Sequence, residues 1–122
     1  LKRRALLFII SDFAFPSGSS LLRAAVQKHD AVGIHVFDPR ELHLPNMGRV
    51  RFRDPETGRE RVVNTGSPSW RRKFGEKVME ARRAREELCR ENRLDLVSIS
   101  TSDNLVLPLR RFFELRKKRR RR

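Results

Sequence analysis

The stretch ALLFIISDF, at residues 5–13, is a short run of apolar side chains that ends abruptly at Ser11 and Asp12. A continuous apolar run of this length is typical of a strand buried on both faces, as in a parallel sheet. Two further runs have the same character: AVGIHVFD at residues 31–38 and DLVSIST at residues 95–101. The three runs together predict a mostly parallel sheet with three core strands.

The segments between these runs have the spacing of helices. In the first, apolar side chains recur at helical intervals: Leu21, Leu22, Ala25 and Val26. Either Ser17 or Ser19 is placed to cap that helix. A longer helix should begin at Pro68 with Ser67 as its cap. Its apolar stripe is expected to lie against the sheet: Trp70, Phe74, Val78, Ala81, Ala84 and Leu88.

The segment between the second strand and the long helix has a different sequence pattern. Val50 and Phe52 alternate with three arginines, Arg49, Arg51 and Arg53, and turn-forming residues follow at 54–58. This pattern predicts a solvent-facing antiparallel hairpin at about residues 46–63.

The order of elements predicts the fold class and the domain organisation. A strand, helix and strand, then the hairpin, then a helix, strand and helix indicate a three-layer α/β fold with an inserted β-hairpin. A last helix should turn Leu109, Phe112 and Phe113 inward, with Pro108 in its first turn. We therefore expect one domain at residues 1–115 and a basic tail at residues 116–122.

Charge is the most unusual property of the composition. The 122 residues carry a formal net charge of +14, and the tail RKKRRRR supplies seven of these positive charges. Such a run is either a solvated tail or a binder of phosphate, on nucleic acid or anionic lipid. No apolar run approaches the roughly 20 residues that span a bilayer. The single cysteine, Cys89, excludes a disulfide within the chain.

Carboxylates follow all three predicted strands. Asp12, Asp38 and Asp103 should lie along the edge of the sheet where open α/β proteins bind ligands, and carboxylates there could hold Mg²⁺. Asp residues after strands also start turns and cap helices, which is the simpler interpretation of Asp38 and Asp103. For Asp12, the sequence leaves two interpretations open: a metal ligand or a turn residue.

Other chemistry has little support in the sequence. His29, His35 and His43 are scattered, and His35 lies inside a strand. No recognisable nucleophile motif is present. We therefore expect no enzyme, although Asp12 and Asp103 as paired carboxylates are the alternative.

The pattern DPREL.LPN.GRVRFRDPETGRE, at residues 38–60, resembles the bacterial domain-of-unknown-function 58 family, as do LLFIISDF before it and PLRRFFELRKKRR after it. The match corresponds to the C-terminal half of the region usual for that family. The family is similar to von Willebrand factor type A domains, which are doubly wound α/β folds with a metal-ion-dependent adhesion site. The resemblance implies that LLFIISD, at residues 6–12, is the fourth strand of such a fold.

The resemblance also implies a site and a partner. Asp12 matches the last of the adhesion-site motifs, and Mg²⁺ would bind in the intact protein, with its other ligands upstream of residue 1. One carboxylate alone cannot build a six-oxygen site. Phe13 departs from the family pattern, which usually has Gly there. Members of the family often occur with MoxR-type AAA+ ATPases, as partners in chaperone-like or assembly work.

The favoured function is therefore a protein-interaction module. Its expected partner-binding residues lie on the hairpin: Arg49, Arg51, Arg53 and Glu56. A purely structural flap is the alternative role of this hairpin. A second function is non-specific binding of nucleic acid or an anionic membrane surface through the hairpin and tail. The absence of Tyr and of aromatics among the basic residues disfavours nucleic acid.

Two further expectations concern the state of the chain. Because it lacks an initial Met and begins close to a strand, we expect it to be part of a longer, cytoplasmic protein whose full-length form associates with membrane. An apolar strand at residues 5–11 without its upstream neighbour would expose an edge, which predicts self-association.

Overall fold

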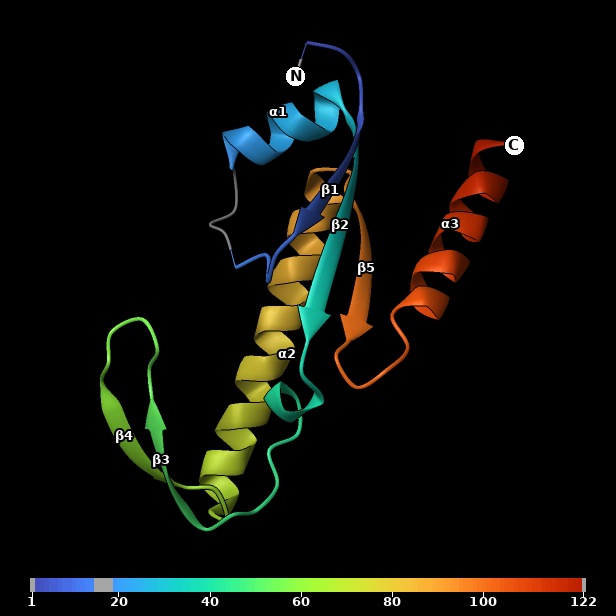
Figure 1. The fold of residues 1–122 in the computed structure, drawn as a ribbon. Coiled ribbons are helices and arrows are strands. Elements are labelled where there is room, and N and C mark those ends of the chain that lie inside the picture. Colours follow the sequence, from blue (N-terminus) through green and yellow to red (C-terminus); the bar gives the residue numbers. More distant parts are fainter. Residues whose placement is uncertain (1, 15–18, 122) are drawn as a thin grey trace. The chain divides into compact units, whose positions relative to one another are not determined.

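The computed structural model describes residues 2–14 and 19–121. Its helices and strands, labelled in Figure 1, are β1 (Leu6–Ile10), α1 (Ser20–Lys28), β2 (Asp30–Phe37), β3 (Arg49–Arg53), β4 (Glu60–Asn64), α2 (Pro68–Glu91), β5 (Asp95–Ser100) and α3 (Val106–Arg120). A 3₁₀ turn at Pro39–Glu41 follows β2. The chain divides into two compact units. We call them the sheet unit (Leu1–Pro39 with Ala81–Arg122) and the hairpin unit (Arg40–Glu80).

The sheet unit is built on three parallel strands in the order β1-β2-β5, which point the same way in Figure 1. Phe8 pairs with Val32, and Ile34 pairs with Val97. The predicted mixed α/β class with a parallel three-stranded sheet is thus confirmed. Because β2 is the central strand, its residues 31–35 are all buried.

Helices cover both faces of this sheet. On one face, Leu22 of α1 and Leu88 and Cys89 of α2 form a core with Ala31 and Leu94. On the other face, three side chains of α3 pack against Val32, Ile34, Val97 and Ile99: Leu109, Phe112 and Phe113. The inward face predicted for the last helix is therefore confirmed, and Pro108 lies in its first turn.

Phe13 fills a gap that glycine leaves in β2. A Cβ atom on Gly33 would lie 2.8 Å from Cζ of Phe13, so the phenyl ring occupies the space that a side chain at position 33 would need. Phe13 is 3% exposed and adopts a φ of 57°, a left-handed conformation that is rare for a bulky residue. Burial of the ring offsets the strain of that backbone conformation.

β1 forms an edge of the three-stranded sheet in the described part of the chain. Three of its side chains remain exposed: Leu6 at 51%, Phe8 at 47% and Ile10 at 70%. Leu7 and Ile9 instead pack against the core on the opposite face. Self-association through this apolar edge stays a prediction.

Two expectations about helices need correction. Only Leu88 of the predicted α2 stripe is buried in the sheet unit, while Trp70, Phe74 and Val78 belong to the hairpin unit. A 24-residue helix is longer than one side of this small sheet requires, so its two halves serve different units. The basic tail is also mostly helical, because α3 continues to Arg120.

Helix starts agree better with the sequence. Ser19 caps α1 by accepting a hydrogen bond from the Leu22 N–H at 3.3 Å, whereas Ser17 lies outside the described residues. Pro68 is the first residue of α2, and the Ser67 carbonyl oxygen accepts from the Arg71 N–H at 3.0 Å. Across the described residues, no helix is both long and apolar enough to cross a bilayer.

Candidate protein-interaction site

Asp12 lies just beyond the carboxyl end of β1, where its side chain shapes a turn. Its Oδ1 atom accepts a hydrogen bond from the Ala14 N–H at 3.1 Å and lies 3.5 Å from the Ser11 hydroxyl. The Ser11 hydroxyl in turn accepts from the Phe13 N–H at 3.0 Å. These bonds hold the backbone in the conformation that places the Phe13 ring in the core.

The residues present do not fit a magnesium site. Nowhere in residues 2–14 and 19–121 do three His, Cys, Asp or Glu side chains gather closely enough to hold a metal ion. Asp103 lies in the turn after β5, where its N–H donates to the Ser100 carbonyl oxygen. At the start of α3, the Val106 N–H donates to the side-chain oxygen of Asn104 instead of to Asp103. Of the two simpler interpretations of Asp103, a turn residue is therefore confirmed and the cap of a helix was wrong.

We expect millimolar Mg²⁺ to leave the thermal unfolding midpoint of this chain unchanged, because Mg²⁺ requires about six well-placed oxygen ligands. An ion that binds only the folded state must raise the midpoint. Differential scanning calorimetry with and without Mg²⁺ measures this, with Ca²⁺ as a second ion. A rise that Asp12→Ala abolishes would contradict the expectation and restore Asp12 as a ligand.

Two reactive residue types are buried in packed positions. Burial, with a further contribution from the Arg85 charge, lowers the pKa of His35, although Asp12 opposes the shift. The ring is therefore neutral at pH 7 and stacks on Phe37 at a centroid distance of 5.6 Å. Burial likewise raises the pKa of the Cys89 thiol, which remains protonated in the core. Both positions agree with packing roles for these residues.

The hairpin of residues 49–64 is anchored at its open end by Thr65. This side chain is fully buried, and its hydroxyl donates to the Gly48 carbonyl oxygen at 2.7 Å and accepts from the Met47 N–H at 2.9 Å. The Thr65 carbonyl oxygen accepts from the Arg71 guanidinium at 3.0 Å. The buried hydroxyl, with one bond donated and one accepted, fixes the open end of the hairpin, and the Arg71 bond links that end to the first turns of α2.

The closed end of the hairpin is shaped by Asp54. Its carboxylate accepts from the N–H groups of Glu56 and Thr57 and from the Thr57 hydroxyl. The Glu56 N–H bond is the largest cause of the lowered pKa of Asp54. Gly58 closes the turn at a φ of 71°, a conformation that glycine adopts without strain. The turn therefore holds its shape without any partner.

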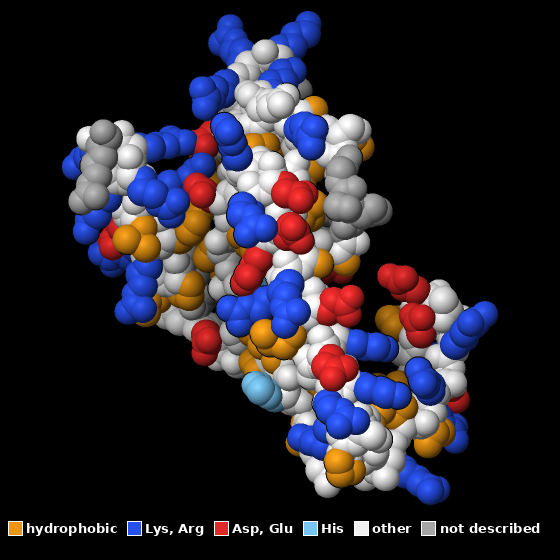
Figure 2. All heavy atoms as spheres, turned by 180° about the vertical axis from the view of Figure 1, so that it is seen from behind, with side chains coloured by type: hydrophobic (Ala, Val, Ile, Leu, Met, Phe, Trp, Pro, Cys, Tyr) orange, Lys and Arg blue, Asp and Glu red, His pale blue; other side chains and the backbone are white. Residues whose placement is uncertain are grey.

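Pairing between β3 and β4 gathers the predicted arginines on one face. Successive residues of a strand point to opposite faces, so Arg49, Arg51 and Arg53 share a face with their cross-strand neighbours Asn64, Val62 and Glu60. All six are exposed. We call these six residues the arginine face. The hairpin, at lower right in Figure 2, shows Lys and Arg side chains with acidic and apolar ones between them.

The arginine face keeps most of its positive charge. Arg51 forms an ion pair with Glu60 at 3.5 Å, and the two side chains are 69% and 50% exposed. Such an exposed pair contributes little to stability, so its groups can exchange partners readily. Glu56 is not on this face but in the turn. The structure thus brings the three predicted arginines together and separates Glu56 from them.

The basic residues at the end of the chain contribute to packing, which sequence reasoning missed. Arg116 contacts Asp30 at 2.6 Å and Asp95 at 2.9 Å, and Arg120 also pairs with Asp30. Burial alone would raise the pKa of Asp30, but hydrogen bonds from Arg120 and Arg116 and their charges lower it overall. The spacing of these residues could have predicted their position. Arg116 and Arg120 follow Phe112 at intervals of one helical turn, so they share the face of the helix that packs on the sheet.

Comparison with known proteins places these features in a family context. The sequence model of the family described as "Protein of unknown function DUF58" matches residues 1–85. Uncharacterized proteins of Mycobacterium bovis and Mycobacterium tuberculosis are 41% identical over 58 residues, which are 47% of this chain and 18% of theirs. A Mycobacterium avium protein has the same identity over 34% of its length. No solved structure matches the chain significantly.

Proposed function

Because the chain belongs to the DUF58 family of proteins of unknown function, we propose that it is a protein-interaction module whose partner is a MoxR-type AAA+ ATPase. The work of the pair would be chaperone-like or directed to complex assembly. The chain spans about a fifth to a third of the length of the curated relatives it matches, so this proposal concerns one part of a larger activity. It puts the chain in the cytoplasm.

The proposed fold is the second half of a von Willebrand factor type A-like domain with the hairpin as an insertion. The parallel order β1-β2-β5 and the helices on both faces of the sheet support it. The position of β3 and β4 in the chain, between β2 and α2, supports the insertion. In such a fold, an adhesion-site metal of the intact protein would need ligands from outside this chain.

The arginine face is the observation that carries the proposal. Its three arginines project from a hairpin whose two ends are held by Thr65 and Asp54, so a partner need not order the backbone on binding. Avoiding that ordering strengthens association. Exposed arginines at alternate positions present guanidinium groups for carboxylates, which they bind through two parallel hydrogen bonds. The partner surface should therefore be acidic.

Replacing all three arginines with Gln should weaken binding to a MoxR-type ATPase about tenfold, since each exposed charge pair contributes about 0.2–1 kcal/mol. Biolayer interferometry with the purified ATPase measures the dissociation constant. The matched control removes three charges from the exposed surface of α2, at Arg72, Lys73 and Arg83. It should change the dissociation constant less than about threefold.

Two outcomes would count against this proposal. Equal weakening by both triple variants would mean that only net charge matters, and the arginine face would not be the interface. If the chain with its hairpin unaltered does not bind the ATPase, the ATPase is not its partner.

The outward side of α3 supports the alternative function, binding to an anionic surface. Arg111, Lys117, Lys118 and Arg121 are exposed cations, and Leu115 beside them is 57% exposed. Figure 2 shows Lys and Arg side chains along this helix, at the left of that view. Apolar and basic side chains together suit an anionic membrane better than nucleic acid. This function would persist when the hairpin arginines are replaced.

A further inference from the structure

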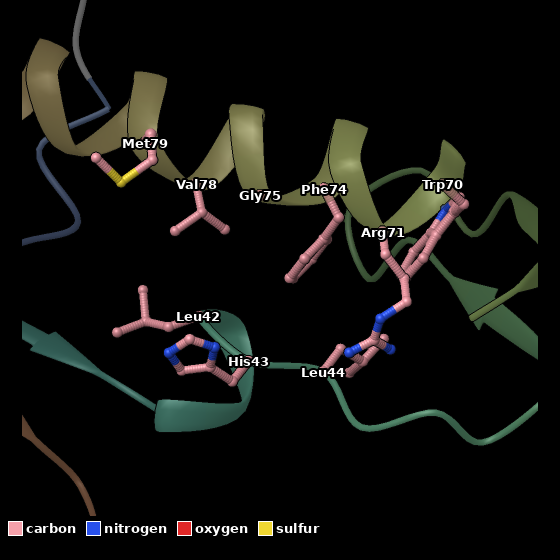
Figure 3. A pocket seen from close by; sticks show the side chains of 9 residues that line it. All are labelled: Leu42, His43, Leu44, Trp70, Arg71, Phe74, Gly75, Val78 and Met79. Atoms are coloured by element: carbon pink, nitrogen blue, oxygen red, sulfur yellow. The ribbon is translucent and has the colours of Figure 1, made fainter. Parts of the chain in front are cut away.

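The hairpin unit contains a cavity of about 300 Å³ between residues 42–44 and the first half of α2. Figure 3 shows Phe74 and Val78 pointing from α2 toward Leu42 and His43 across this space. Ligand pockets range from roughly 300 to 1,000 Å³, so this one has room for one or two side chains rather than for a large cofactor.

The walls of the cavity are apolar and partly preformed. Trp70 and Phe74 stack with ring centroids 5.3 Å apart and an interplanar angle of 17°, which gives one flat aromatic wall. Leu42, Leu44 and Met79 add aliphatic surface. Gly75 leaves part of the helix surface bare, because no atom other than those of its chain neighbours and the adjacent helix backbone lies within 4 Å of the place where its Cβ would be.

The charge at the cavity has one sign. Arg71 donates one hydrogen bond to the Thr65 carbonyl oxygen, and a guanidinium has five N–H donors in all. Among the described residues that line the cavity, none is acidic. The hairpin unit as a whole has ten Lys and Arg against six Asp and Glu, a formal net charge of +4. An apolar group that carries a carboxylate nearby therefore complements the site.

We infer that this cavity receives an apolar side chain of a protein partner, with an adjacent Asp or Glu of that partner bound by Arg71. The inference rests on the proposed function and gives the partner a recognition element, an apolar anchor within an acidic segment. Such anchors in pockets, with charges at the rim, are typical of specific protein interfaces.

The fluorescence of Trp70 provides a direct test, because it is the single Trp of a chain without Tyr. Three tetrapeptides serve as probes: acetyl-Glu-Leu-Phe-Glu-amide, its uncharged analogue with Gln for Glu, and its polar analogue with Ser for Leu and Phe. The first should saturate the fluorescence change, the second should bind about tenfold more weakly and the third should not bind.

Three variants separate the cavity from the rest of the unit. Gly75→Leu should fill the cavity and abolish binding of the acidic peptide, while helix content and the unfolding midpoint stay unchanged or rise, because Leu is a better helix former than Gly. Arg71→Gln should reduce binding of the acidic peptide to that of the uncharged one and leave the latter unchanged. Arg72→Gln, which removes the same charge outside the cavity, should have little effect.

Equal binding of the acidic and uncharged peptides, or full binding by a folded Gly75→Leu variant, would overturn the inference. Arg49, Arg51 and Arg53 do not line the cavity, so the experiments test the ATPase proposal and the cavity proposal independently. Loss of peptide binding with intact ATPase binding would remove only the cavity as a site. The reverse result would retain the cavity and exclude the ATPase as the partner.

Discussion

Replacing Phe13 with Ala is expected to lower the free energy of unfolding by about 3–5 kcal/mol, the usual effect of truncating a buried phenyl ring. The ring is 3% exposed and lies against Gly33 of the central strand, which has no side chain of its own to fill the space that the ring leaves. Ala at position 13 retains the strained backbone conformation but loses the packing that offsets it. Equilibrium urea unfolding followed by far-ultraviolet circular dichroism measures the change.

Phe52→Ala is the matched control for this prediction. It removes the same ring from the hairpin, where Phe52 is 39% exposed, so the loss should be clearly smaller. Equal losses at the two positions would contradict the account of Phe13 as a residue that the sheet core requires.

Arg116→Met should lower the free energy of unfolding by about 1–2 kcal/mol, because two partly buried carboxylates lose their shared cation and keep only the more exposed Arg120 and Arg119 as partners. The side chains of Arg116, Asp30 and Asp95 are only 14%, 20% and 34% exposed. Met retains most of the apolar stem of Arg, so the loss reports on the charge. The control is Arg110→Met, whose exposed ion pair with Glu114 should contribute less than about 0.5 kcal/mol.

The effect of Arg116→Met should depend on pH in a direction set by Asp30. The pKa of Asp30 in the folded protein is below its ordinary value of 3.8, so ionised Asp30 favours folding. That contribution is fully present above the pKa of the unfolded chain and is lost as the pH falls through the lower pKa of the folded state. The difference between the two proteins should therefore be constant near neutral pH and shrink below pH 3.8. A difference that stays constant down to strongly acidic pH would show that packing of the stem, not charge, is what the substitution removes.

Much of the sheet unit could be predicted from the sequence, because its signals are local. Apolar runs at residues 5–11, 31–38 and 95–101 became three parallel strands, each within one or two residues of the expected bounds. Alternation in β3 predicted which arginines share a face, because a strand has a period of two.

The candidate interaction site was only partly predictable. The arginines of the hairpin were visible as a pattern in the sequence, but the cavity of the hairpin unit was not. It depends on where residues 42–44 lie against α2, and neither segment reveals that by itself. The sequence predicted that the apolar stripe of α2 packs against the sheet. A repeat of apolar residues shows that one face of a helix is buried, but it does not show which part of the protein covers that face.

The sequence by itself determined the class of the sheet unit, the start of α2 and the composition of the arginine face, since each depends on neighbouring residues along the chain. Only the tertiary structure decided that Asp12 shapes a turn, that Phe13 completes the core over Gly33, and that Arg116 holds two strand starts. Asp30 and Arg116 are separated by 86 positions, so their pairing is set by the packing of α3 across the sheet. A charge in a basic run looks the same in sequence whether it is solvated or paired, and the fold alone distinguishes the two.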